Sequence, residues 1–378
     1  MKETQPWSRR ARLVVLSLVT VGWTGLLAPT VDLTRPSSQT LARGLDAALA
    51  GPLAHAPQEF ANNPEWALMA NLYEVLGRAN LALAEPSTAA EQLERIDARI
   101  DATLAHEAEA GAHGFLLPYA QRGPFSDPAG RSVFVDGEIA MMLAARLHVA
   151  PSQPYEALLR ERVEHIDGAL ARGPMHSAES YPNECWTFCN TTALAALVLA
   201  DRVLGTDHQP RVQDWLRVAK SSLVEPSSGL LVSSYTWDGT PLDGPEGSSI
   251  WMVAHNLQLL DPAFAQAQYA AAKGALAVTP AGVAWAREWP RSTPARPDVD
   301  SGLVVPGLDA SPGASGLAVL GAAAFDDAEF LDGLLRSMEI AAAPGREGPA
   351  RWHRAAGRIG NAVVFYALNV GPLWAVAA

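Results

Sequence analysis

The chain has 378 residues, of which 49% are hydrophobic and 18% are charged, and its formal net charge is −12. This composition is typical of a globular protein and excludes a disordered chain. The only basic run lies at residues 9–12, which excludes nucleic acid as a partner because phosphates require a clustered basic face. The length allows one large domain or two ordinary ones.

The first predicted element is an apolar run from Leu13 to Ala28, which follows the basic cluster of residues 9–12. A basic flank before an apolar run is typical of a secretory signal or a signal anchor, and the run is close to the roughly 20 residues that cross a bilayer. We therefore expect residues 1–35 to be a signal peptide or membrane anchor. Residues 36–378 are expected to form an exported catalytic domain, periplasmic or anchored to the inner membrane, with membrane contact through the N-terminal segment only.

From residue 38 onward, apolar side chains recur at helical spacing. The predicted helices are 38–54, 64–84, 87–109, 135–148, 153–171, 188–204, 208–223, 247–259, 262–275, 313–324, 327–340 and 358–370. Alternating runs of β-branched residues are short, the best being 230–235, so any strand is expected to belong to a local hairpin. The twelve predicted helices make six pairs.

Short and long connections alternate along these helices. Tight turns lie near 149–153, 204–208, 260–262 and 324–327, and long loops lie at 110–134, 172–187, 224–246, 276–312 and 341–357. In an antiparallel series of helices, every second connection falls at the same end, so the long loops are expected to share one end. The sequence therefore predicts an all-α fold, an (α/α)6 barrel whose inner helices follow the long loops. A solenoid of helical hairpins is the competing architecture, and the absence of a fixed repeat period argues against it.

Long loops without secondary structure are usually functional, and these loops carry acids, phenols, indoles and both cysteines. The candidate catalytic residues are Glu138, Tyr181, Glu184, Cys185, Cys189 and His255. The candidate substrate-binding residues are Asp136, Trp186, Tyr235, Trp237, Glu246, Trp251, Glu288, Trp289 and Asp300. Asp136 equally fits a cap at the start of its helix, and a lone histidine such as His255 equally fits a satisfied core position.

The two cysteines are the most distinctive of these residues. Two cysteines in an exported chain allow a disulfide. Cys185 and Cys189, however, are four apart at the expected start of a helix, where their Cα–Cβ directions run parallel. We expect two free thiols that face the cavity, with Tyr181, Glu184 and His255 within one residue layer of them. The spacing does not favour zinc, and we expect no metal and no cofactor.

The stretch from Glu179 to Thr191, ESYPNECWTFCNT, resembles the linalool dehydratase-isomerase family. Its members are exported (α/α)6-barrel proteins whose deep apolar pocket uses cysteines, tyrosine, aspartate and histidine. They add or remove water at an allylic tertiary alcohol and isomerise it without a cofactor. The resemblance implies roles for Tyr181, Cys185 and Cys189, and more loosely for the loop with Tyr235 and Trp237. The cysteines stand closer together here than expected for the catalytic pair of that family.

The leading hypothesis is a cofactor-independent lyase or isomerase that performs acid–base (de)hydration of a hydroxylated, largely apolar small molecule. Aromatic side chains such as Trp186, Trp237 and Trp251 would shelter a developing carbocation. The second hypothesis is a glycoside hydrolase-like barrel with paired carboxylates and tryptophan sugar platforms. Its carboxylates would come from Asp136, Glu184, Glu246, Glu288 and Asp300, and its platforms would be Trp237 and Trp289. A non-catalytic binding protein of the cell envelope is the third, and an oligomer is compatible with all three.

Overall fold

A computed structural model of the chain describes residues 36–54, 63–118, 123–292 and 304–377. The described residues from Ser38 onward form one compact unit. The expected signal or anchor segment, residues 1–35, and the candidate residue Asp300 lie outside the described residues. The export of the chain therefore stays a prediction.

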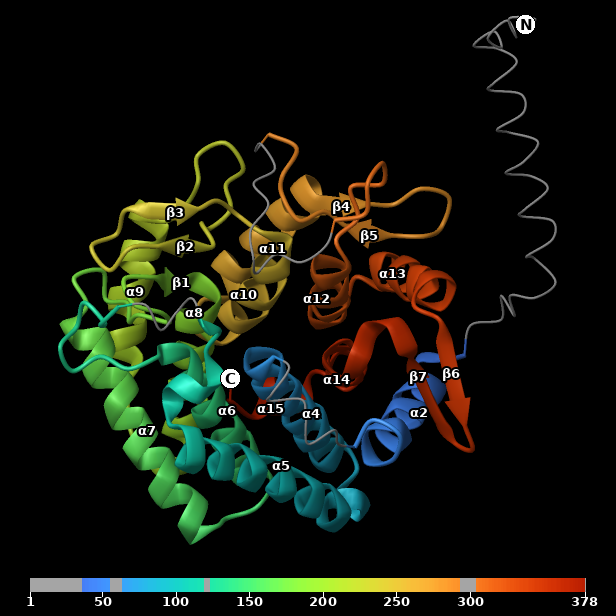
Figure 1. Cartoon of the computed structure of the whole chain (residues 1–378), viewed down its shortest axis with the longest axis horizontal. Coiled ribbons are helices and arrows are strands. Elements are labelled where there is room, and N and C mark those ends of the chain that lie inside the picture. Colours follow the sequence, from blue (N-terminus) through green and yellow to red (C-terminus); the bar gives the residue numbers. More distant parts are fainter. Residues whose placement is uncertain (1–35, 55–62, 119–122, 293–303, 378) are drawn as a thin grey trace, which may run out of the picture. The chain divides into compact units, whose positions relative to one another are not determined.

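Six helices form a closed inner ring, in which each helix packs against the next and the last packs against the first (Figure 1). They are α4 (Pro64–Ala84), α6 (Val133–Val149), α8 (Thr187–Leu204), α10 (Gly247–Leu260), α12 (Pro312–Ala324) and α14 (Gly357–Ala367). Outer helices surround them, namely α2 (Ser38–Ala50), α5 (Ala89–Ala110), α7 (Gln153–Arg172), α9 (Gln209–Ser222), α11 (Pro262–Leu276) and α13 (Ala328–Ala341). The predicted (α/α)6 barrel is confirmed.

Inner and outer helices differ in how their side chains are buried. In α6, every residue from Val133 to Leu147 is buried, as expected for a helix that is covered all round. In α9, the buried residues are Val212, Trp215, Leu216 and Ala219, a single stripe at spacings of three and four. Neighbouring inner helices also approach closely: a Cβ added at Gly137 on α6 would lie 3.1 Å from the backbone of α8.

Contacts between successive long loops confirm that four of these loops share one end of the barrel, the long-loop end. The carboxylate of Glu179 accepts the backbone N–H of Ser126 and of Asp127, which joins the first and second loops. The pairing of Cys185 with Tyr235 joins the second and third loops. The backbone N–H of Gly247, at the end of the third loop, donates to the carbonyl of Glu288 in the fourth. The inner helices therefore run parallel, with their N-termini at this end.

The strands are short and belong to the loops. They form a three-stranded sheet of β1 (Cys185–Trp186), β2 (Ser234–Tyr235) and β3 (Pro241–Asp243), and two hairpins, β4 (Ala277–Val278) with β5 (Trp285–Ala286) and β6 (Pro344–Glu347) with β7 (Ala350–His353). The prediction of local hairpins is correct for these two and for β2 with β3, in which the end of the 230–235 run pairs with residues a few positions further on. It is wrong for β1, which pairs with β2 because two different long loops meet at the same end.

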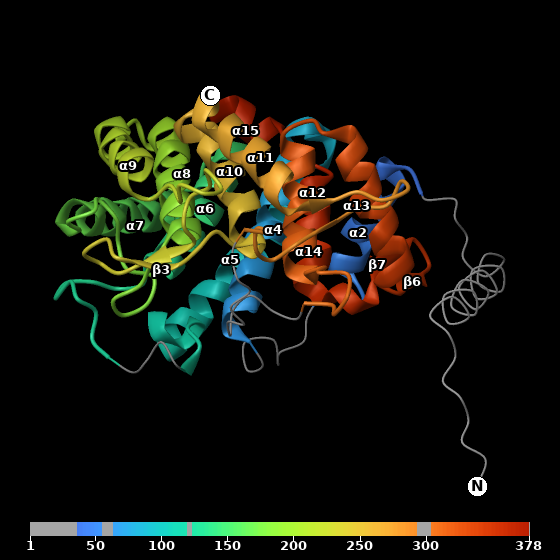
Figure 2. The same cartoon turned by 90° about the horizontal axis from the view of Figure 1, so that it is seen from above.

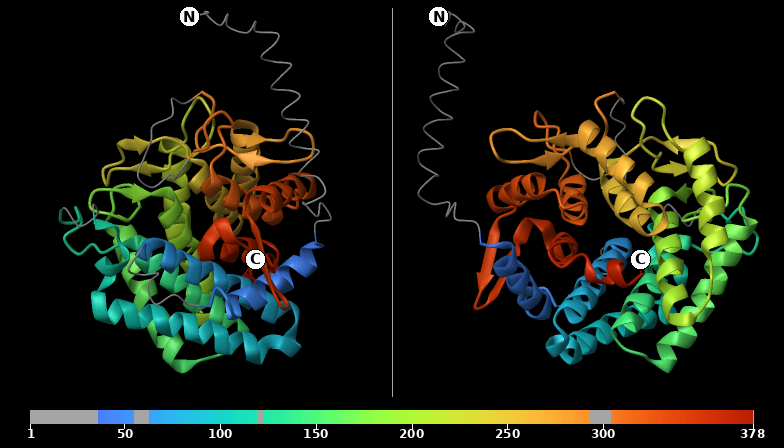
Figure 3. Two further views of the ribbon diagram at one scale, coloured as in Figure 1. Left: turned by 45° about the vertical axis from the view of Figure 1, so that its right-hand side comes forward. Right: turned by 180° about the vertical axis from the view of Figure 1, so that it is seen from behind.

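Short helices complete the described fold. Three are 3₁₀ helices, η1 (Pro86–Thr88), η2 (Ala112–Phe115) and η4 (Arg354–Ala356), and one is the C-terminal helix α15 (Pro372–Ala377). Figure 2 shows α15 and β3 at opposite ends of the barrel, so α15 lies at the tight-turn end. The backbone N–H of Leu373 donates to Asn80 Oδ1 at 2.8 Å and the indole of Trp374 donates to the carbonyl of His255 at 3.3 Å. In the view from behind, α15 lies within the outline of the ring (Figure 3).

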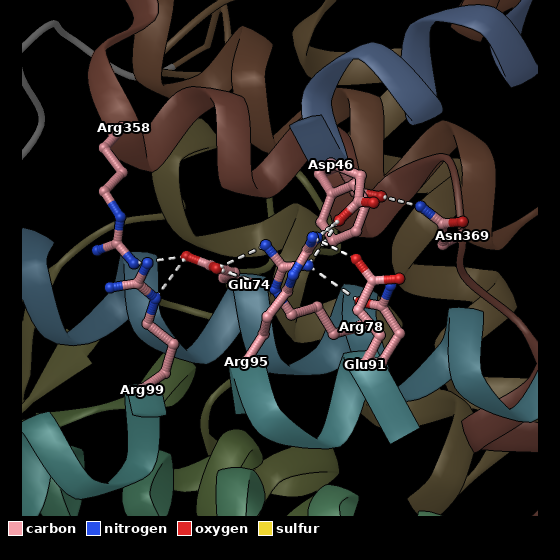
Figure 4. Close-up of polar contacts among 10 residues, drawn as sticks. Asp46, Glu74, Arg78, Glu91, Arg95, Arg99, Arg358 and Asn369 are labelled. Carbon is pink, nitrogen blue, oxygen red and sulfur yellow. Dashed lines mark hydrogen bonds and ion pairs between the residues drawn. The ribbon is translucent and has the colours of Figure 1, made fainter. Parts of the chain in front are cut away.

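A buried ionic network, the ring-closing network of Asp46, Glu74, Arg78, Arg99 and Arg358, joins the first helices to the last (Figure 4). Glu74 on α4 pairs with Arg78 at 2.9 Å, with Arg99 on α5 at 3.0 Å and with Arg358 on α14 at 2.7 Å. Arg78 also pairs with Asp46 on α2 at 2.6 Å. The N-terminal helix α2 thereby becomes the outer partner of the C-terminal inner helix α14.

One inner helix, α8, is long and apolar enough to cross a bilayer, but 83% of its apolar window is buried inside the barrel. Among the described residues it is the only helix of this kind. Its apolarity follows from its place in the ring, because both faces pack against other helices.

Candidate functional site

The interior of the ring holds polar side chains at its long-loop half. We define the interior cluster as Glu65 and Tyr73 on α4, Glu138 on α6 and Cys189 on α8, all of which are buried. Each interacts electrostatically with at least one other: Glu138 with Glu65, Tyr73 with Glu138, and Cys189 with both glutamates. Because α6 separates α4 from α8 in the ring, the interactions between α4 and Cys189 cross the interior.

Glu138 is the centre of this cluster. Its side chain is 1% exposed, and neither carboxyl oxygen has a hydrogen-bond partner among the described residues. Burial raises the pKa of Glu138 well above its usual value, and the neighbouring charge of Glu65 raises it further. Burial and the neighbouring carboxyl thus both favour the protonated form of Glu138. A buried carboxyl without partners costs roughly 1–3 kcal/mol, which a purely structural position would not require.

Tyr73 and Cys189 share the surroundings of Glu138. The Tyr73 hydroxyl is buried and has no hydrogen-bond partner among the described residues. Burial raises the pKa of Tyr73, and the carboxyl of Glu138 and the thiol of Cys189 raise it further. Burial likewise raises the pKa of Cys189, although a hydrogen bond with Ser180 opposes the shift. Both side chains are therefore neutral at physiological pH, and Cys189 is a thiol and not a thiolate nucleophile.

Glu65 is the member of the interior cluster that lies nearest the N-terminus of its helix, and it contacts Tyr181 of the second long loop. The Tyr181 hydroxyl donates to Glu65 Oε1 at 2.7 Å, and the backbone N–H of Leu117 donates to the same oxygen at 3.0 Å. These two donors stabilise the carboxylate form of Glu65. The cluster therefore combines one carboxyl group that accepts hydrogen bonds, Glu65, with one whose pKa is raised by burial, Glu138. Environments that separate two carboxyl groups in this way are typical of acid–base sites.

Deeper in the barrel, a second polar group crosses the interior. Tyr366 on α14 and His255 on α10 are separated by α12 in the ring, yet the Tyr366 hydroxyl lies 2.6 Å from His255 Nε2. The rings of Tyr366 and Tyr73 are stacked with their centroids 6.2 Å apart. Burial lowers the pKa of His255 to about 4, so the imidazole is neutral at physiological pH.

The predicted layer of Cys185, Cys189 and His255 is wrong in two respects. Helix α8 begins at Thr187, so Cys185 lies on strand β1 and the helical spacing of four does not apply. Cys185 is fully buried and faces the same side of its sheet as its partner Tyr235. His255 is the ninth residue of α10 and Cys189 the third of α8, which separates them along the barrel axis by roughly 9 Å at the helical rise. Both cysteines are free thiols, as predicted.

Three further candidates face away from the interior. Asp136 neither caps α6 nor reaches a cavity, because Arg131 and Arg162 pair with it; Ser132 is the N-cap. Trp251 packs outward against Tyr269 and Phe330, with ring centroids 6.0 and 5.8 Å away. The Tyr235 hydroxyl bonds to Ser177 at 2.7 Å inside the loop layer. Each residue is a polar or aromatic residue near a long loop, but the orientation of its helix (Asp136 and Trp251) or strand (Tyr235) directs the side chain away from the interior.

The remaining candidates lie around the mouth. Glu184 accepts a hydrogen bond from the indole of Trp186 at 3.2 Å, and both are half-buried. Trp237 is half-buried at the loop surface, and its backbone N–H donates to Asn183 at 3.3 Å. Glu246 is buried and occupies the N-cap position of α10 without a side-chain cap bond.

Glu288 and Trp289 line a surface pocket of about 240 Å³ together with Arg287, Arg291 and Asp309. The Glu288 carboxylate itself is buried, and it accepts from the backbone N–H of Ser248 at 3.0 Å and from the hydroxyl of Ser311. Glu288 therefore ties the N-termini of α10 and α12 together. Trp289, which is half-buried, remains available to a ligand in this pocket.

Sequence reasoning missed Glu65, Tyr73 and Tyr366. These residues lie on helices and not in the loops on which the predictions concentrated. Their signal was a polar side chain within an inner helix, since a helix that is buried all round leaves such a side chain no solvent to face. Among the described residues, no group of three or more His, Cys, Asp or Glu side chains is placed to hold a metal ion.

No family model matches the chain. The fold is similar to that of a GH76 α-mannanase from Bacteroides thetaiotaomicron, with a TM-score of 0.51 and 13% identity over 90% of this chain and 98% of the other. It is also similar to a D-mannose isomerase, with a TM-score of 0.51 and 10% identity over 89% and 99% of the two chains. At these identities the similarity shows the (α/α)-barrel fold alone. The resemblance to the linalool dehydratase-isomerase family stays a hypothesis.

Proposed function

We propose that this chain is a cofactor-independent acid–base enzyme of the lyase or isomerase class, with Glu138 as the acid. The observation that carries the proposal is the buried carboxyl group of Glu138, which has no hydrogen-bond partner among the described residues and whose pKa is raised by burial. Its substrate is a small, largely apolar molecule with a hydroxyl group, which enters from the long-loop end. This substrate class also follows from the resemblance at Glu179–Thr191.

In this reaction the Glu138 carboxyl donates its proton to the substrate hydroxyl, the C–O bond breaks, and water leaves. A carboxylate then takes a proton from the adjacent carbon, and Glu65 is the candidate, because it interacts electrostatically with Glu138. The phenol rings of Tyr73 and Tyr181 offer π faces to the positive charge that develops. Cys189 lies beside the acid as a thiol and would donate a weak hydrogen bond to the substrate.

The closed character of the site favours this class over a hydrolase of long polysaccharides. Glu138 is 1% exposed and Cys189 is 5% exposed, so a chain of sugars would not reach the acid without a larger opening. Apolar surroundings also keep water away from a carbocation and raise the pKa of the acid that forms it.

A second candidate is a glycoside hydrolase or sugar isomerase, because Glu65 and Glu138 make a pair of interacting carboxyl groups inside the ring. The fold shared with an α-mannanase and a mannose isomerase is consistent with this candidate. Trp289 at the surface pocket would provide a platform for a sugar ring.

The test uses the purified protein, Glu138→Gln and the matched control Asp136→Asn, which changes a neighbouring buried carboxylate that is ion-paired to arginines. Allylic alcohols are incubated in ¹⁸O-labelled water and followed by mass spectrometry for dehydration and for label exchange. Aryl mannosides, mannan and free mannose are assayed in parallel. We expect turnover of an allylic alcohol that Glu138→Gln lowers by about 10²–10⁴-fold and that Asp136→Asn retains.

The outcomes separate the candidate functions. Turnover of a mannoside or of mannose, lost in Glu138→Gln, would support the second candidate and overturn the first. Turnover that survives Glu138→Gln would exclude Glu138 as the acid. Tight binding of an alcohol without any conversion by the wild type would favour a non-catalytic binding protein.

A further inference from the structure

The proposed dehydration uses the interior cluster and leaves a second set of charged residues at the long-loop end unused. These residues line the surface pocket of about 240 Å³ in the fourth long loop. Arg287, Glu288, Trp289 and Arg291 follow strand β5, and Asp309 precedes helix α12, against which β5 packs (Figure 1). The pocket shares no residue with the interior cluster, so it is a candidate for a separate binding site.

Hydrogen bonds fix the backbone on both walls of this pocket. On one wall, the backbone N–H of Arg287 donates to the carbonyl of Leu276 at 2.9 Å. On the other, the turn 305–310 is closed by a hydrogen bond of 2.8 Å between its first N–H and its last carbonyl. The indole of Trp285 donates to the carbonyl of Leu308 in this turn at 3.0 Å and so ties the two walls together. A backbone that is already ordered lowers the entropic cost of binding a ligand.

The guanidinium group of Arg287 has one edge in use and one edge with an unsatisfied donor. Its Nη1 donates to the carboxylate of Asp309. Its Nε is buried and has no hydrogen-bond partner among the described residues. The edge formed by Nε and Nη2 matches the two oxygens of a carboxylate. Because a buried donor without an acceptor costs stability, a carboxylate placed against this edge would remove that cost.

The charges around the pocket suit an anion with a single charge. Arg291 is exposed, and no carboxylate pairs with it among the described residues. The Glu288 carboxylate accepts from the backbone N–H and the hydroxyl of Ser248 and from the hydroxyl of Ser311, at the starts of α10 and α12. The two helix N-termini, each equivalent to roughly +0.5 of a charge, offset its charge. The two arginines of the pocket and Asp309 then leave one net positive charge.

We propose that this pocket binds a six-membered ring that carries one carboxylate group. The carboxylate lies on the Nε–Nη2 edge of Arg287, and the ring lies against the indole of Trp289, which is half-buried and lines the same pocket. The volume is below the roughly 300 Å³ at which pockets for drug-sized ligands begin, so it suits one ring and not a chain of rings. The site does not depend on the proposed function, because binding requires no chemical step.

A uronic acid and an aromatic acid present the same chemistry to this pocket, and the test distinguishes them. The full chain is labelled with 5-fluorotryptophan and titrated under ¹⁹F NMR, with the Trp289 signal identified as the one absent from Trp289→Phe. Glucuronate and benzoate are the carboxylate ligands, and glucose and benzyl alcohol are their neutral counterparts. We expect the Trp289 signal to shift to saturation with at least one of the acids and with neither neutral compound.

Variants of Arg287 test how the carboxylate is recognised. Arg287→Gln should weaken binding about tenfold or more, because it removes a charged donor. Arg287→Lys keeps the charge without the planar fork and should also weaken binding. The matched control is Arg211→Gln on α9, because the Arg211 side chain is 20% exposed and pairs with Asp167, while that of Arg287 is 17% exposed and pairs with Asp309. Both glutamine variants lose one partly exposed ion pair and should fold, and Arg211→Gln should bind like wild type.

The absence of a Trp289 shift with both acids would overturn the proposal, and so would equal affinity of Arg287→Gln and wild type. An equal response to a neutral counterpart would overturn it as well. Acetate and inorganic phosphate are the ionic controls, and an equal shift with either would show that the pocket recognises charge without a ring. A preference for glucuronate would identify the ligand as a sugar acid, and a preference for benzoate would identify an aromatic acid.

Failure of this site is distinguishable from failure of the proposed function. Glu138→Gln lies outside the pocket and should bind the ring acids like wild type while it loses turnover. If Glu138→Gln loses turnover and the wild type does not bind ring acids, the acid role of Glu138 stands and the carboxylate site does not. If ring acids bind and Glu138→Gln keeps turnover, the carboxylate site stands alone.

Discussion

Two buried glutamates on neighbouring inner helices have opposite surroundings. Glu74 on α4 is fully buried among three arginines of the ring-closing network (Figure 4). Glu138 on α6 is equally buried, but no arginine or lysine pairs with it among the described residues. Burial alone would raise the pKa of Glu74, yet Arg78, Arg358 and Arg99 outweigh it and lower that pKa, whereas nothing opposes the rise at Glu138.

The difference shows that burial alone does not decide whether a carboxyl group is ionised. The neighbouring charges decide it. The Glu74 carboxylate stays ionised and pairs with arginines on α4, α5 and α14, so it links the first helices of the barrel to the last inner helix. At Glu138 no cation opposes the effect of burial among the described residues, so the protonated form is favoured and an acid lies inside the ring. The ion pairs of Glu74 hold the barrel closed. The unpaired carboxyl group of Glu138 costs stability, and such a group is typical of a functional site. The predictions below separate the two roles.

The largest expected effect is at Glu74. Glu74→Ala leaves three buried arginines without their shared partner, and removing one member of a buried ion pair costs about 3–5 kcal/mol of unfolding free energy. The measurement is urea-induced unfolding followed by far-UV circular dichroism. Glu138→Leu is the matched change on the neighbouring helix, and it should be neutral or stabilising, because it removes a buried polar group without a partner.

Equal destabilisation by Glu74→Ala and Glu138→Leu would contradict the comparison, since it would make Glu138 a structural group like Glu74. If Glu74→Ala fails to fold, Glu74→Gln replaces it, because glutamine keeps the shape of the side chain. Glu74→Gln should fold with a lower unfolding free energy than wild type, whereas Glu138→Leu should not.

The next effect is the pH dependence of stability. The pKa of Glu138 is raised in the folded state above its unfolded value of about 4.3. Its contribution to stability is therefore fully present below about pH 4 and is lost as the pH rises. Urea unfolding of wild type and Glu138→Gln from pH 5 to pH 8 should show a growing advantage of the variant. The slope of this difference is at most about 1.4 kcal/mol per pH unit.

Glu74 should behave with the opposite sign. Its pKa is lowered in the folded state, so its stabilising contribution is present above the unfolded pKa and is lost as the pH falls. The difference in unfolding free energy between wild type and Glu74→Gln should therefore become smaller as the pH falls. Stability curves for Glu138→Gln and wild type that run parallel from pH 5 to pH 8 would show that the pKa of Glu138 is not perturbed.

A smaller effect distinguishes the two cysteines. Cys185 packs beside Tyr235 in the loop sheet and Cys189 belongs to the interior cluster. Cys185→Ala should cost about 1–2 kcal/mol as a buried deletion and keep turnover. Cys189→Ala should stay within about 1 kcal/mol of wild type and lower turnover, measured with whichever substrate the Glu138→Gln assay identifies. If Cys185→Ala instead lost turnover and Cys189→Ala kept it, the reacting groups would lie next to the loop sheet.

The sequence was sufficient for the barrel because its two signals are local. Apolar spacing located the helices, and the alternation of tight turns with long loops placed the long loops at one end. The ring-closing network could not be predicted, because α2 and α14 stand at opposite ends of the described chain. Only the closed ring brings Asp46 and Arg358 into one network.

The candidate site was predicted only in part, for a reason that concerns helix orientation. Glu138 and Tyr181 were identified from their place near the long loops, and so was Cys189. The direction in which an inner helix turns each side chain is set by its neighbours, so Asp136 and Trp251 were assigned to the cavity but face arginines and outer helices. Tyr73 and Tyr366, deep within helices, carried no loop signal at all.

The smallest effect concerns the N-terminal segment. Deleting residues 1–35 should leave the unfolding free energy unchanged, because α2 begins at Ser38 and contributes Asp46 to the ring-closing network. It should also abolish membrane association or export if the run from Leu13 to Ala28 is an anchor or signal, measured by fractionation of expressing cells. Deleting residues 1–50 is the matched control, and it removes Asp46 and the buried α2 stripe that contains Leu45. That longer deletion should lower the unfolding free energy or unfold the barrel, because Arg78 then loses one of its two carboxylate partners. A chain that unfolds when only residues 1–35 are removed would make this segment part of the core and would refute the export prediction.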